Sequence, residues 1–434
     1  MRSNIEILLK EGTLLANKFI EFNKLAQSPY HAVCELREKA IGLGFKELKE
    51  TDDWKLEPST TYFITRGGLS SFVAFHVPSN FSHLTSSLKI FGTHTDSPCL
   101  RLTPNFSIEA SGFEQVCIQC YGGGLWYTWF DRDLILAGRV VVRAGDKLEE
   151  RLIKTDAIAK VSTLAIHLMK DRTGALSINK ETELRPILGS LSLKDIGIPD
   201  LRTLLANEAE VSPENLISFD LCFADANPPS LFGLRKEFLS SPRLDNLCSV
   251  FSTMEAFSSY IQTPKDLMSN QDISILAAFD HEEIGSETYV GADSSYMQSI
   301  IQRIVNSLSD STYVHSILSR SVLISADMAH GVHPNYSYLH QSKHVPELNK
   351  GIVLKTNCNG RYTTDALSAA LLKNLSSKAS IPIQDFVVSN ESPCGSTIGP
   401  LLASKLGCLS LDIGAPQLGM HSIRETMGII DLVH

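Results

Sequence analysis

The chain has 434 residues, 43% of them hydrophobic and 20% charged, and these values are typical of a globular protein long enough for two domains. It carries 39 basic and 48 acidic residues, a net charge of −9, and no Lys/Arg-rich block, so we expect no nucleic-acid partner. No stretch reaches the roughly 18 apolar residues of a membrane span, and the first residues lack the apolar core of a secretory signal. Nine dispersed cysteines, an odd number, favour reduced thiols, so we expect a cytoplasmic protein without membrane contact.

The N-terminal part predicts two helices followed by strands. Residues 4–26 and 28–43 have helical patterns, the second with Ser28 as N-cap and Pro29 in its first turn. Apolar runs typical of strands follow at 62–65, 71–77 and 88–92. The last of these runs delivers His94 at its C-terminal end.

The middle of the chain is rich in short β-type segments punctuated by glycine. Strands are predicted at 113–121, 139–143 and 217–224, and a helix is predicted at 157–170. Residues 227–230, Asn-Pro-Pro-Ser, are the strongest linker signal in the chain. We therefore expect an inserted, β-rich domain at residues 102–230.

Beyond the linker, helices alternate with continuous apolar strands. Helices are predicted at 244–261, 293–308 and 364–376, and strands at 273–279, 322–326, 352–356 and 408–413. Apolar strands interleaved with helices are typical of a sheet that is covered on both faces. The sequence thus predicts an α/β domain, a mostly parallel sheet sandwiched by helices, formed by residues 1–101 and 231–434.

Side chains that can bind metal follow three of the predicted strands. They are His94, the pair Glu282 and Glu283, and Asp327. Open α/β sheets bind ligands beyond the carboxyl ends of their strands, so we expect these side chains to meet. Together with Asp245 and His421 they offer the imidazole and carboxylate donors that zinc accepts, enough for two ions that share one carboxylate.

Two features indicate how such a site would work. Asp96, two residues after His94, is placed to accept the imidazole N–H that does not face a metal, which would orient the ring. In the pair Glu282 and Glu283, one carboxylate would bind metal while the other takes a proton from water. The residues alone leave open which glutamate does which. Acidic residues at the start of a surface helix are the alternative interpretation of the pair.

Seven longer segments carry motifs that extend over nearly the whole chain. They lie at 92–101, 121–134, 241–247, 279–286, 325–336, 393–400 and 419–425. They include Gly-Thr-His-Thr-Asp-Ser, Phe-Asp-His-Glu-Glu and Gly-Met-His-Ser. In these motifs and in their order the chain resembles the aspartyl aminopeptidases, a family of dinuclear zinc metallopeptidases.

The resemblance implies two zinc ions per subunit, held by five residues. Asp245 would bridge the two ions. One zinc would add His94 and Asp327, and the other would add Glu283 and His421. Cobalt or manganese would suit the same donors.

The resemblance also implies which residues act on the substrate. Glu282 would be the general base, near Asp96. Lys355 would meet the acidic side chain of the first substrate residue, and His330 would contact the substrate. His167 would enter the active site of a neighbouring subunit and help to hold the substrate carbonyl. Taken alone, a histidine in an apolar helical run is usually part of a core.

These expectations describe a zinc aminopeptidase that removes N-terminal Asp or Glu from peptides. The inserted domain would form dimers, and relatives assemble further into a tetrahedral shell of twelve subunits. A related dinuclear zinc carboxypeptidase or deacylase is the first alternative; in such an enzyme a basic group would hold the C-terminal carboxylate of the substrate. The second alternative is a non-catalytic self-assembling shell protein, which would be expected to lose ligands or the base.

Overall fold

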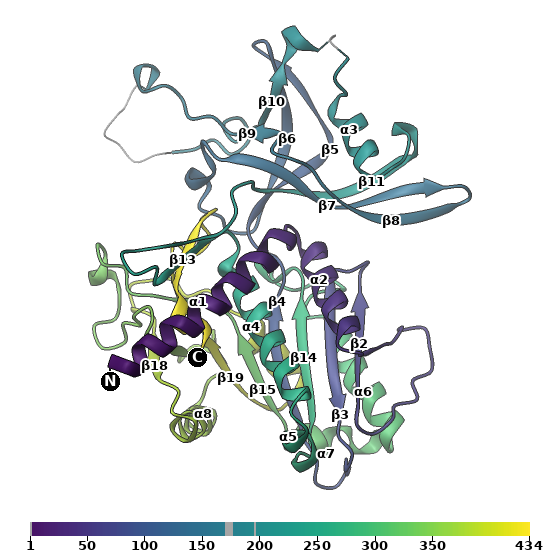
Figure 1. Cartoon of the computed structure of the whole chain (residues 1–434), viewed down its shortest axis with the longest axis vertical. Coiled ribbons are helices and arrows are strands. Elements are labelled where there is room, and N and C mark those ends of the chain that lie inside the picture. Colours follow the sequence, from purple (N-terminus) through teal and green to yellow (C-terminus); the bar gives the residue numbers. More distant parts are fainter. Residues whose placement is uncertain (1, 170–176, 195–196) are drawn as a thin grey trace.

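The computed structural model describes residues 2–169, 177–194 and 197–434. Figure 1 shows two parts stacked along the long axis of the molecule, each built on its own sheet. The lower part contains both ends of the chain, and the upper part is formed by the residues between them. Within the described ranges, no helix has both the length and the apolar character needed to span a bilayer.

A nine-stranded sheet forms the centre of the lower part (Figure 1). Its strands, in order across the sheet, are β1 (Lys46–Glu47), β2 (Thr60–Arg66), β3 (Ser71–Val77), β14 (Ile273–Phe279), β4 (Leu88–His94), β15 (Val322–Ala326), β19 (Leu409–Gly414), β17 (Ile352–Thr356) and β18 (Ile383–Val387). The central strands β14, β4, β15 and β19 are parallel, whereas the pairs β2–β3, β3–β14 and β17–β19 are antiparallel. The sheet is therefore mixed. The connection between β2 and β3, residues 67–70, is too short for the crossover that a parallel pair needs.

The lower part also contains helices. They are α1 (Arg2–Leu25), α2 (Pro29–Gly42), α4 (Leu244–Ile261), α5 (Pro264–Ser269), α6 (Tyr296–Leu308), α7 (Val314–Leu318), α8 (Ala366–Ala379) and α9 (Ile398–Leu406). In β14, Ile275 belongs to the core that includes α6 and α9, whereas Leu276 belongs to the core that includes α2 and α4. Successive side chains of a strand point to opposite faces, so β14 is buried on both.

The described residues between 99 and 225 form the upper part around a seven-stranded antiparallel sheet (Figure 1). Its strands, in order, are β11 (Leu216–Asp225), β5 (Cys99–Ala110), β6 (Phe113–Tyr121), β10 (Ile187–Ser190), β9 (Ala159–Lys160), β7 (Asp133–Ala144) and β8 (Lys147–Lys154). β11 also pairs with β7, which closes the sheet on itself. Leu100, Val116, Leu136 and Phe223 are buried in its core, and the short helix α3 (Leu201–Glu208) contributes Leu205.

A third sheet of five short strands lies beside the candidate ligands. Its strands are β12 (Ser230–Phe232), β13 (Phe238–Ser241), β21 (Glu425–Gly428), β20 (Pro416–Leu418) and β16 (Ala329–His330). β16 begins two residues after Asp327, and the loop between β20 and β21 contains His421. This sheet therefore helps to fix the main chain at both positions.

The helix predicted at 157–170 is wrong. Up to residue 169 the range contains only β9 and the 3-10 turn η2 (Ile166–Leu168), and residue 170 lies outside the described residues. β9 pairs with β7 and β10, which removes the first residues of the range from any helix. The large apolar side chains in residues 164–168 are more than half exposed. Without a surface to pack against, an apolar helix face gains no stability.

Candidate metal centre

Three of the predicted strands deliver side chains to one edge of the sheet. His94 is the last residue of β4, Asp327 directly follows β15, and Glu282 and Glu283 lie in the 3-10 turn η5 (Glu282–Ile284) after β14. β14, β4 and β15 are neighbouring parallel strands, so their carboxyl ends meet. This is the edge at which open α/β sheets bind ligands.

Asp245 and His421 join the cluster from outside the sheet. Asp245 lies in the first turn of α4, where its own backbone is not helical (φ −81°, ψ 105°). His421 has a positive φ of 66° in the loop between β20 and β21. Nδ1 of His421 lies 3.0 Å from the main-chain oxygen of Gly123, so Nε2 faces the cluster.

Asp245 lies between the two histidines. Its Oδ1 is 3.3 Å from Nε2 of His94, and its Oδ2 is 3.6 Å from Nε2 of His421. Oδ1 of Asp327 is 3.4 Å from Nε2 of His94, and Oε1 of Glu283 is 3.3 Å from Nε2 of His421. The ligand atoms thus form two groups that share Asp245, and in each group they all lie within 4.8 Å of one another.

Several carboxylate oxygens of the cluster have no hydrogen-bond donor. Oδ1 of Asp245, Oε1 of Glu283 and Oδ1 of Asp327 are buried and accept no hydrogen bond from the part of the chain that the structure describes. A buried, ionised carboxylate is costly unless it is paired or binds a metal. Imidazole nitrogen and carboxylate oxygen are zinc donors. The residues present therefore fit bound zinc.

Glu282 is placed differently from the other carboxylates. Its Oε2 is 3.9 Å from Nε2 of His94, farther than the oxygens of Asp245 and Asp327. Its side chain is 15% exposed, against 5% for Glu283. Burial raises the pKa of Glu282 to about 8. His94, Glu282 and Glu283 also lie close enough together to hold a metal ion. The distances alone therefore do not show which of the two glutamates binds metal.

Asp96 connects His94 to the glutamate pair. Nδ1 of His94 lies 3.0 Å from the main-chain oxygen of Asp96 and 3.4 Å from its Oδ1. The carboxylate of Asp96 also accepts the main-chain N–H of Glu282 at 3.1 Å and of Glu283 at 3.0 Å. Burial opposes the ionisation of Asp96, but hydrogen bonds, above all from His94, hold its pKa below the usual value. The sequence predicted that the carboxylate of Asp96 would accept the N–H of His94, whereas its main-chain oxygen is the closer acceptor. The contacts with the glutamates were not predicted.

Glu425 is a site residue to which the sequence analysis assigned no role. Its buried carboxylate accepts the main-chain N–H of Asp245 at 3.0 Å and of His421 at 2.8 Å. Burial, and after it the charge of Asp245, raises the pKa of Glu425 to about 8. Glu425 lies in the motif at 419–425, but an acceptor for main-chain N–H groups leaves no pattern in a sequence, because every residue type except proline can supply the donor.

Lys355, predicted to bind substrate, lies next to a candidate ligand. The side chain is almost fully buried, with Nζ 3.5 Å from Oδ2 of Asp327 and 3.1 Å from the main-chain oxygen of Met328. Nζ also lies 5.1 Å from the centre of the Tyr362 ring. The ammonium group is therefore buried at the edge of the cluster, beside a candidate ligand.

The other two predicted substrate residues lie in different places. His330 ends β16, three residues after Asp327, and its exposed ring is 5.8 Å from the ring of Phe386. His167 lies in η2 of the upper part and is exposed. None of the metal-spaced groups found among the described residues includes His167. The alternative interpretation of His167 as part of a helical core is therefore wrong.

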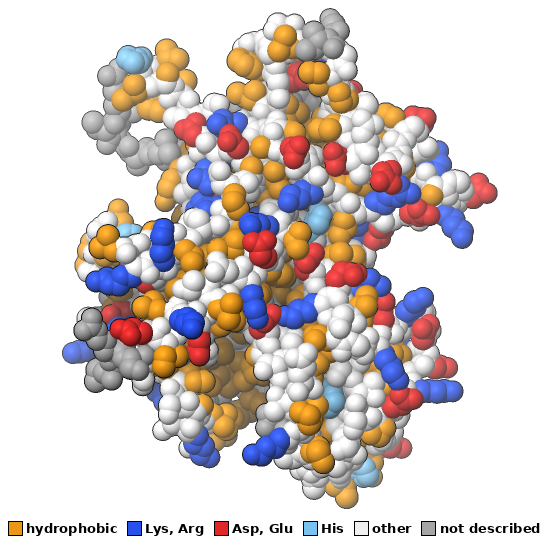
Figure 2. Space-filling model, in the orientation of Figure 1, with side chains coloured by type: hydrophobic (Ala, Val, Ile, Leu, Met, Phe, Trp, Pro, Cys, Tyr) orange, Lys and Arg blue, Asp and Glu red, His pale blue; other side chains and the backbone are white. Residues whose placement is uncertain are grey.

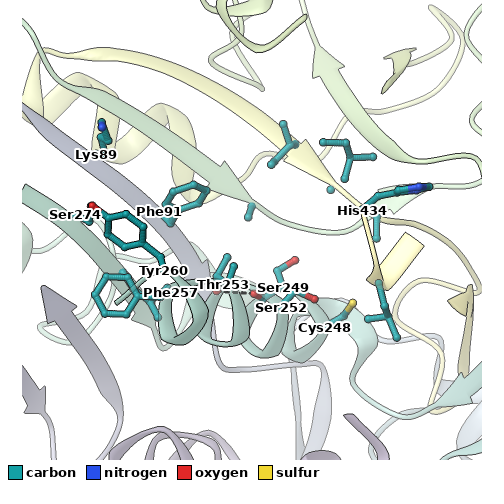
Figure 3. A pocket seen from close by; sticks show the side chains of 18 of the residues that line it. Lys89, Phe91, Cys248, Ser249, Ser252, Thr253, Phe257, Tyr260, Ser274 and His434 are labelled. Atoms are coloured by element: carbon teal, nitrogen blue, oxygen red, sulfur yellow. Dashed lines mark hydrogen bonds between the residues drawn. The ribbon is translucent and has the colours of Figure 1, made fainter. Parts of the chain in front are cut away.

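A wide cavity lies between α4 and strands of the nine-stranded sheet (Figure 3). It has a volume of 680 Å³ and runs along α4, with Ser249, Thr253 and Tyr260 on one side, Phe91 of β4 on the other and His434 at one end. Figure 2 shows that this side of the lower part is hollowed and that hydrophobic side chains lie inside the hollow. None of the predicted site residues lines the cavity, so it is separate from the predicted chemistry.

Comparisons with known proteins cover most of the chain. Residues 22–434 match the family described as Aminopeptidase I zinc metalloprotease (M18). Aspartyl aminopeptidase 1 of Schizosaccharomyces pombe is 41% identical over 433 residues, which cover 95% of this chain and 91% of that protein. The aspartyl aminopeptidase of Caenorhabditis elegans is 39% identical over 431 residues, which cover 94% and 91%.

Solved structures have the same fold. A chain from the cryo-EM structure of the Ape4 and Nbr1 complex matches with a TM-score of 0.94 at 39% identity, covering 98% of this chain and 84% of that chain. A chain of the Saccharomyces cerevisiae mApe1 dodecamer matches with a TM-score of 0.83 at 27% identity, covering 96% and 93%. The similarity therefore includes both the lower and the upper part.

Proposed function

Because the chain belongs to the aminopeptidase I zinc metalloprotease (M18) family, it is an aminopeptidase, and we propose that it removes N-terminal Asp and Glu from peptides. Two relatives named aspartyl aminopeptidases are 41% and 39% identical to it. The observation that carries the proposed hydrolase chemistry is the position of Asp245, whose two oxygens face His94 and His421. A carboxylate shared by two groups of ligands is suited to a hydrolase with two metals.

We infer that each subunit holds two zinc ions. Asp245 would be shared by the two ions, with His94 and Asp327 holding one of them and Glu283 and His421 holding the other. When bound, such ions polarise a carbonyl group and lower the pKa of water. The same donors accept cobalt or manganese, so the metal found in a preparation depends partly on supply.

Glu282 is the general base in this proposal. Its carboxylate lies at the cluster, but farther from the His94 nitrogen than the ligand oxygens, so it is available to take a proton from the attacking water. It then returns the proton to the amine that leaves when the peptide bond breaks. Asp96 holds the main chain of Glu282 and Glu283, which keeps the base and its neighbouring ligand in fixed positions.

Lys355 provides the preference for acidic residues. Its buried ammonium group has the carboxylate of Asp327 as a neighbour at 3.5 Å. A metal ion bound to Asp327 would partly neutralise the charge of that carboxylate. Lys355 would then be able to pair with the side-chain carboxylate of a substrate. His330, at the end of β16, contacts the same substrate in this arrangement.

The upper part lies almost entirely within the inserted domain predicted at residues 102–230, and we propose that this domain mediates dimerisation. Its turn η2 exposes His167 together with the large apolar side chains of residues 164–168. Exposed apolar segments are typical of protein interfaces. In a dimer, His167 would enter the partner subunit's site and stabilise the oxyanion formed from the substrate carbonyl.

Since the mApe1 relative is a dodecamer, we propose that dimers assemble further into a tetrahedral dodecamer in the cytoplasm.

Rates on anilides of single amino acids test the proposed activity. The zinc-loaded protein should cleave Asp- and Glu-anilide faster than Ala- and Leu-anilide, and it should not cleave the N-acetylated Asp compound. Equal rates on all four anilides would remove the acidic preference and leave a general aminopeptidase. Cleavage of the acetylated compound would favour a deacylase, because only an aminopeptidase requires the free amine.

A further inference from the structure

Tyr121, the last residue of β6, links the upper part to the metal cluster. Its side chain is buried, and its hydroxyl donates a hydrogen bond of 2.7 Å to Oδ2 of Asp96. Burial and the charge of Asp96 raise the pKa of Tyr121 well above its usual value. The hydroxyl therefore keeps its proton and acts as a donor.

Asp96 connects the Tyr121 hydroxyl to the main chain of the two glutamates. The oxygen that accepts the hydrogen bond from Tyr121 also accepts the main-chain N–H of Glu283 at 3.0 Å. The other oxygen accepts the main-chain N–H of Glu282 at 3.1 Å. The orientation of one carboxylate group thus determines where both N–H groups lie, and the Tyr121 hydroxyl holds that orientation.

Packing keeps the end of β6 in place. The guanidinium group of Arg101 lies over the Tyr121 ring, 3.7 Å from its centre. The next residue, Gly122, has a φ of +72°, and a Cβ at this position would come within 3.2 Å of Cβ of Glu283. Glycine is therefore needed there both for its backbone conformation and for the close approach to the glutamate.

We propose that Tyr121 is a positioning residue for the glutamate pair, because its hydroxyl holds Asp96 in the orientation that places Glu282 for proton transfer. This inference rests on the proposed role of Glu282 as the general base. A base must lie within hydrogen-bond reach of the proton that it takes, so a small displacement lowers turnover and leaves substrate binding unchanged. Because Tyr121 belongs to the upper part, it also ties the position of the base to the proposed dimerisation domain.

A comparison of Tyr121→Phe with Tyr62→Phe tests the proposal. Tyr62 is also buried, and its hydroxyl accepts one hydrogen bond, 2.8 Å from the main-chain N–H of Glu57, in the core beside Phe75. Each variant loses one buried hydroxyl and keeps the ring. In protein saturated with zinc, we expect Tyr121→Phe to lower kcat about tenfold with KM unchanged. Tyr62→Phe should lower only the melting temperature. All rates are measured on the anilide that the wild-type protein cleaves fastest.

Combination with Asp96→Asn gives a second readout. If the hydroxyl acts through Asp96, Tyr121→Phe should lower kcat much less in the Asp96→Asn background than in the wild type. An unchanged kcat in Tyr121→Phe, or the same tenfold loss in both backgrounds, would overturn the inference. A missing preference for Asp and Glu does not affect this test, because the substrate is chosen by rate. A normal kcat in Glu282→Gln would contradict the proposed base instead.

Discussion

Glu425 accepts the main-chain N–H of Asp245 at 3.0 Å, and its other oxygen accepts that of His421 at 2.8 Å. One buried carboxylate thus holds the backbone of the proposed bridging ligand and of a ligand on one side of it. It contributes no bond to the metals in our assignment. Its effect on metal binding is therefore through position alone, as for other groups that orient metal ligands.

Glu425→Gln should weaken metal binding. Glutamine keeps one acceptor and places an N–H group against one of the two main-chain donors, so either Asp245 or His421 loses its support. We expect a loss of metal affinity of roughly 10- to 100-fold, measured by competition with a chelator.

Asp431→Asn is the matched control for Glu425→Gln. Asp431 is also a buried carboxylate, and it accepts the main-chain N–H of Asn349 at 2.6 Å and of Gly351 at 2.9 Å, outside the metal cluster. Its replacement should lower stability and leave metal affinity unchanged. Equal losses of affinity in both variants would show that Glu425 acts only through general stability.

Removal of metal should lower the melting temperature of the wild-type protein. Without ions the carboxylates of Asp245, Glu283 and Asp327 remain buried with oxygens that accept no hydrogen bond from the described residues. Zinc at 100 times its dissociation constant would add about 2.7 kcal/mol to the free energy of unfolding.

In Asp245→Ala both ions lose the shared carboxylate, so we expect no bound metal and no shift of the melting temperature with zinc. A normal metal content in this variant would rule out the bridge.

Lys355→Ala should reduce activity selectively. Loss of the buried cation leaves the side-chain carboxylate of Asp or Glu unpaired in the complex, at a cost on the order of 3–5 kcal/mol that a neutral substrate does not incur. We expect KM to rise strongly for Asp- and Glu-anilide and little for Ala- and Leu-anilide. Lys373→Ala is the control, because Lys373 pairs with Asp385 in a half-exposed ion pair. Parallel losses on acidic and neutral substrates would assign Lys355 a structural role.

A mixture of two inactive variants tests the shared active site. His167→Ala retains the base, and Glu282→Gln retains the histidine, so a mixed dimer should contain one complete site. After random exchange of equal amounts, about a quarter of all sites should be complete. Activity should appear only when subunits exchange, which mass measurements can follow. Exchange without recovery would show that His167 does not serve a neighbouring subunit.

Much of the lower part could be predicted because its strands are continuous apolar runs. The strands expected at 273–279 and 322–326 are present with those limits, and the strand expected at 88–92 extends two residues further. Metal-binding side chains come directly after such runs, so their convergence follows from the parallel arrangement.

The failures have a common cause in tertiary structure. Residues 157–169 contain no α-helix, because residues 159–160 pair with β7 and β10 and the apolar side chains of residues 162–168 are exposed and lie outside the core of the upper part. Glu425 and Tyr121 act on main-chain N–H groups and on Asp96, partners that are distant in sequence. Hydrophobic periodicity carries no information about such contacts.

The division of the glutamate pair is the central claim, and metal content measured together with turnover in Glu282→Gln and Glu283→Gln tests it most directly. We expect Glu282→Gln to keep both metals and to lose at least about 100-fold in kcat, because the base is missing while the ligands remain. Glu283→Gln should lose metal, since Glu283 lies with Asp245 and His421 in one group of ligands. An empty site in Glu282→Gln together with a loaded site in Glu283→Gln would contradict the account.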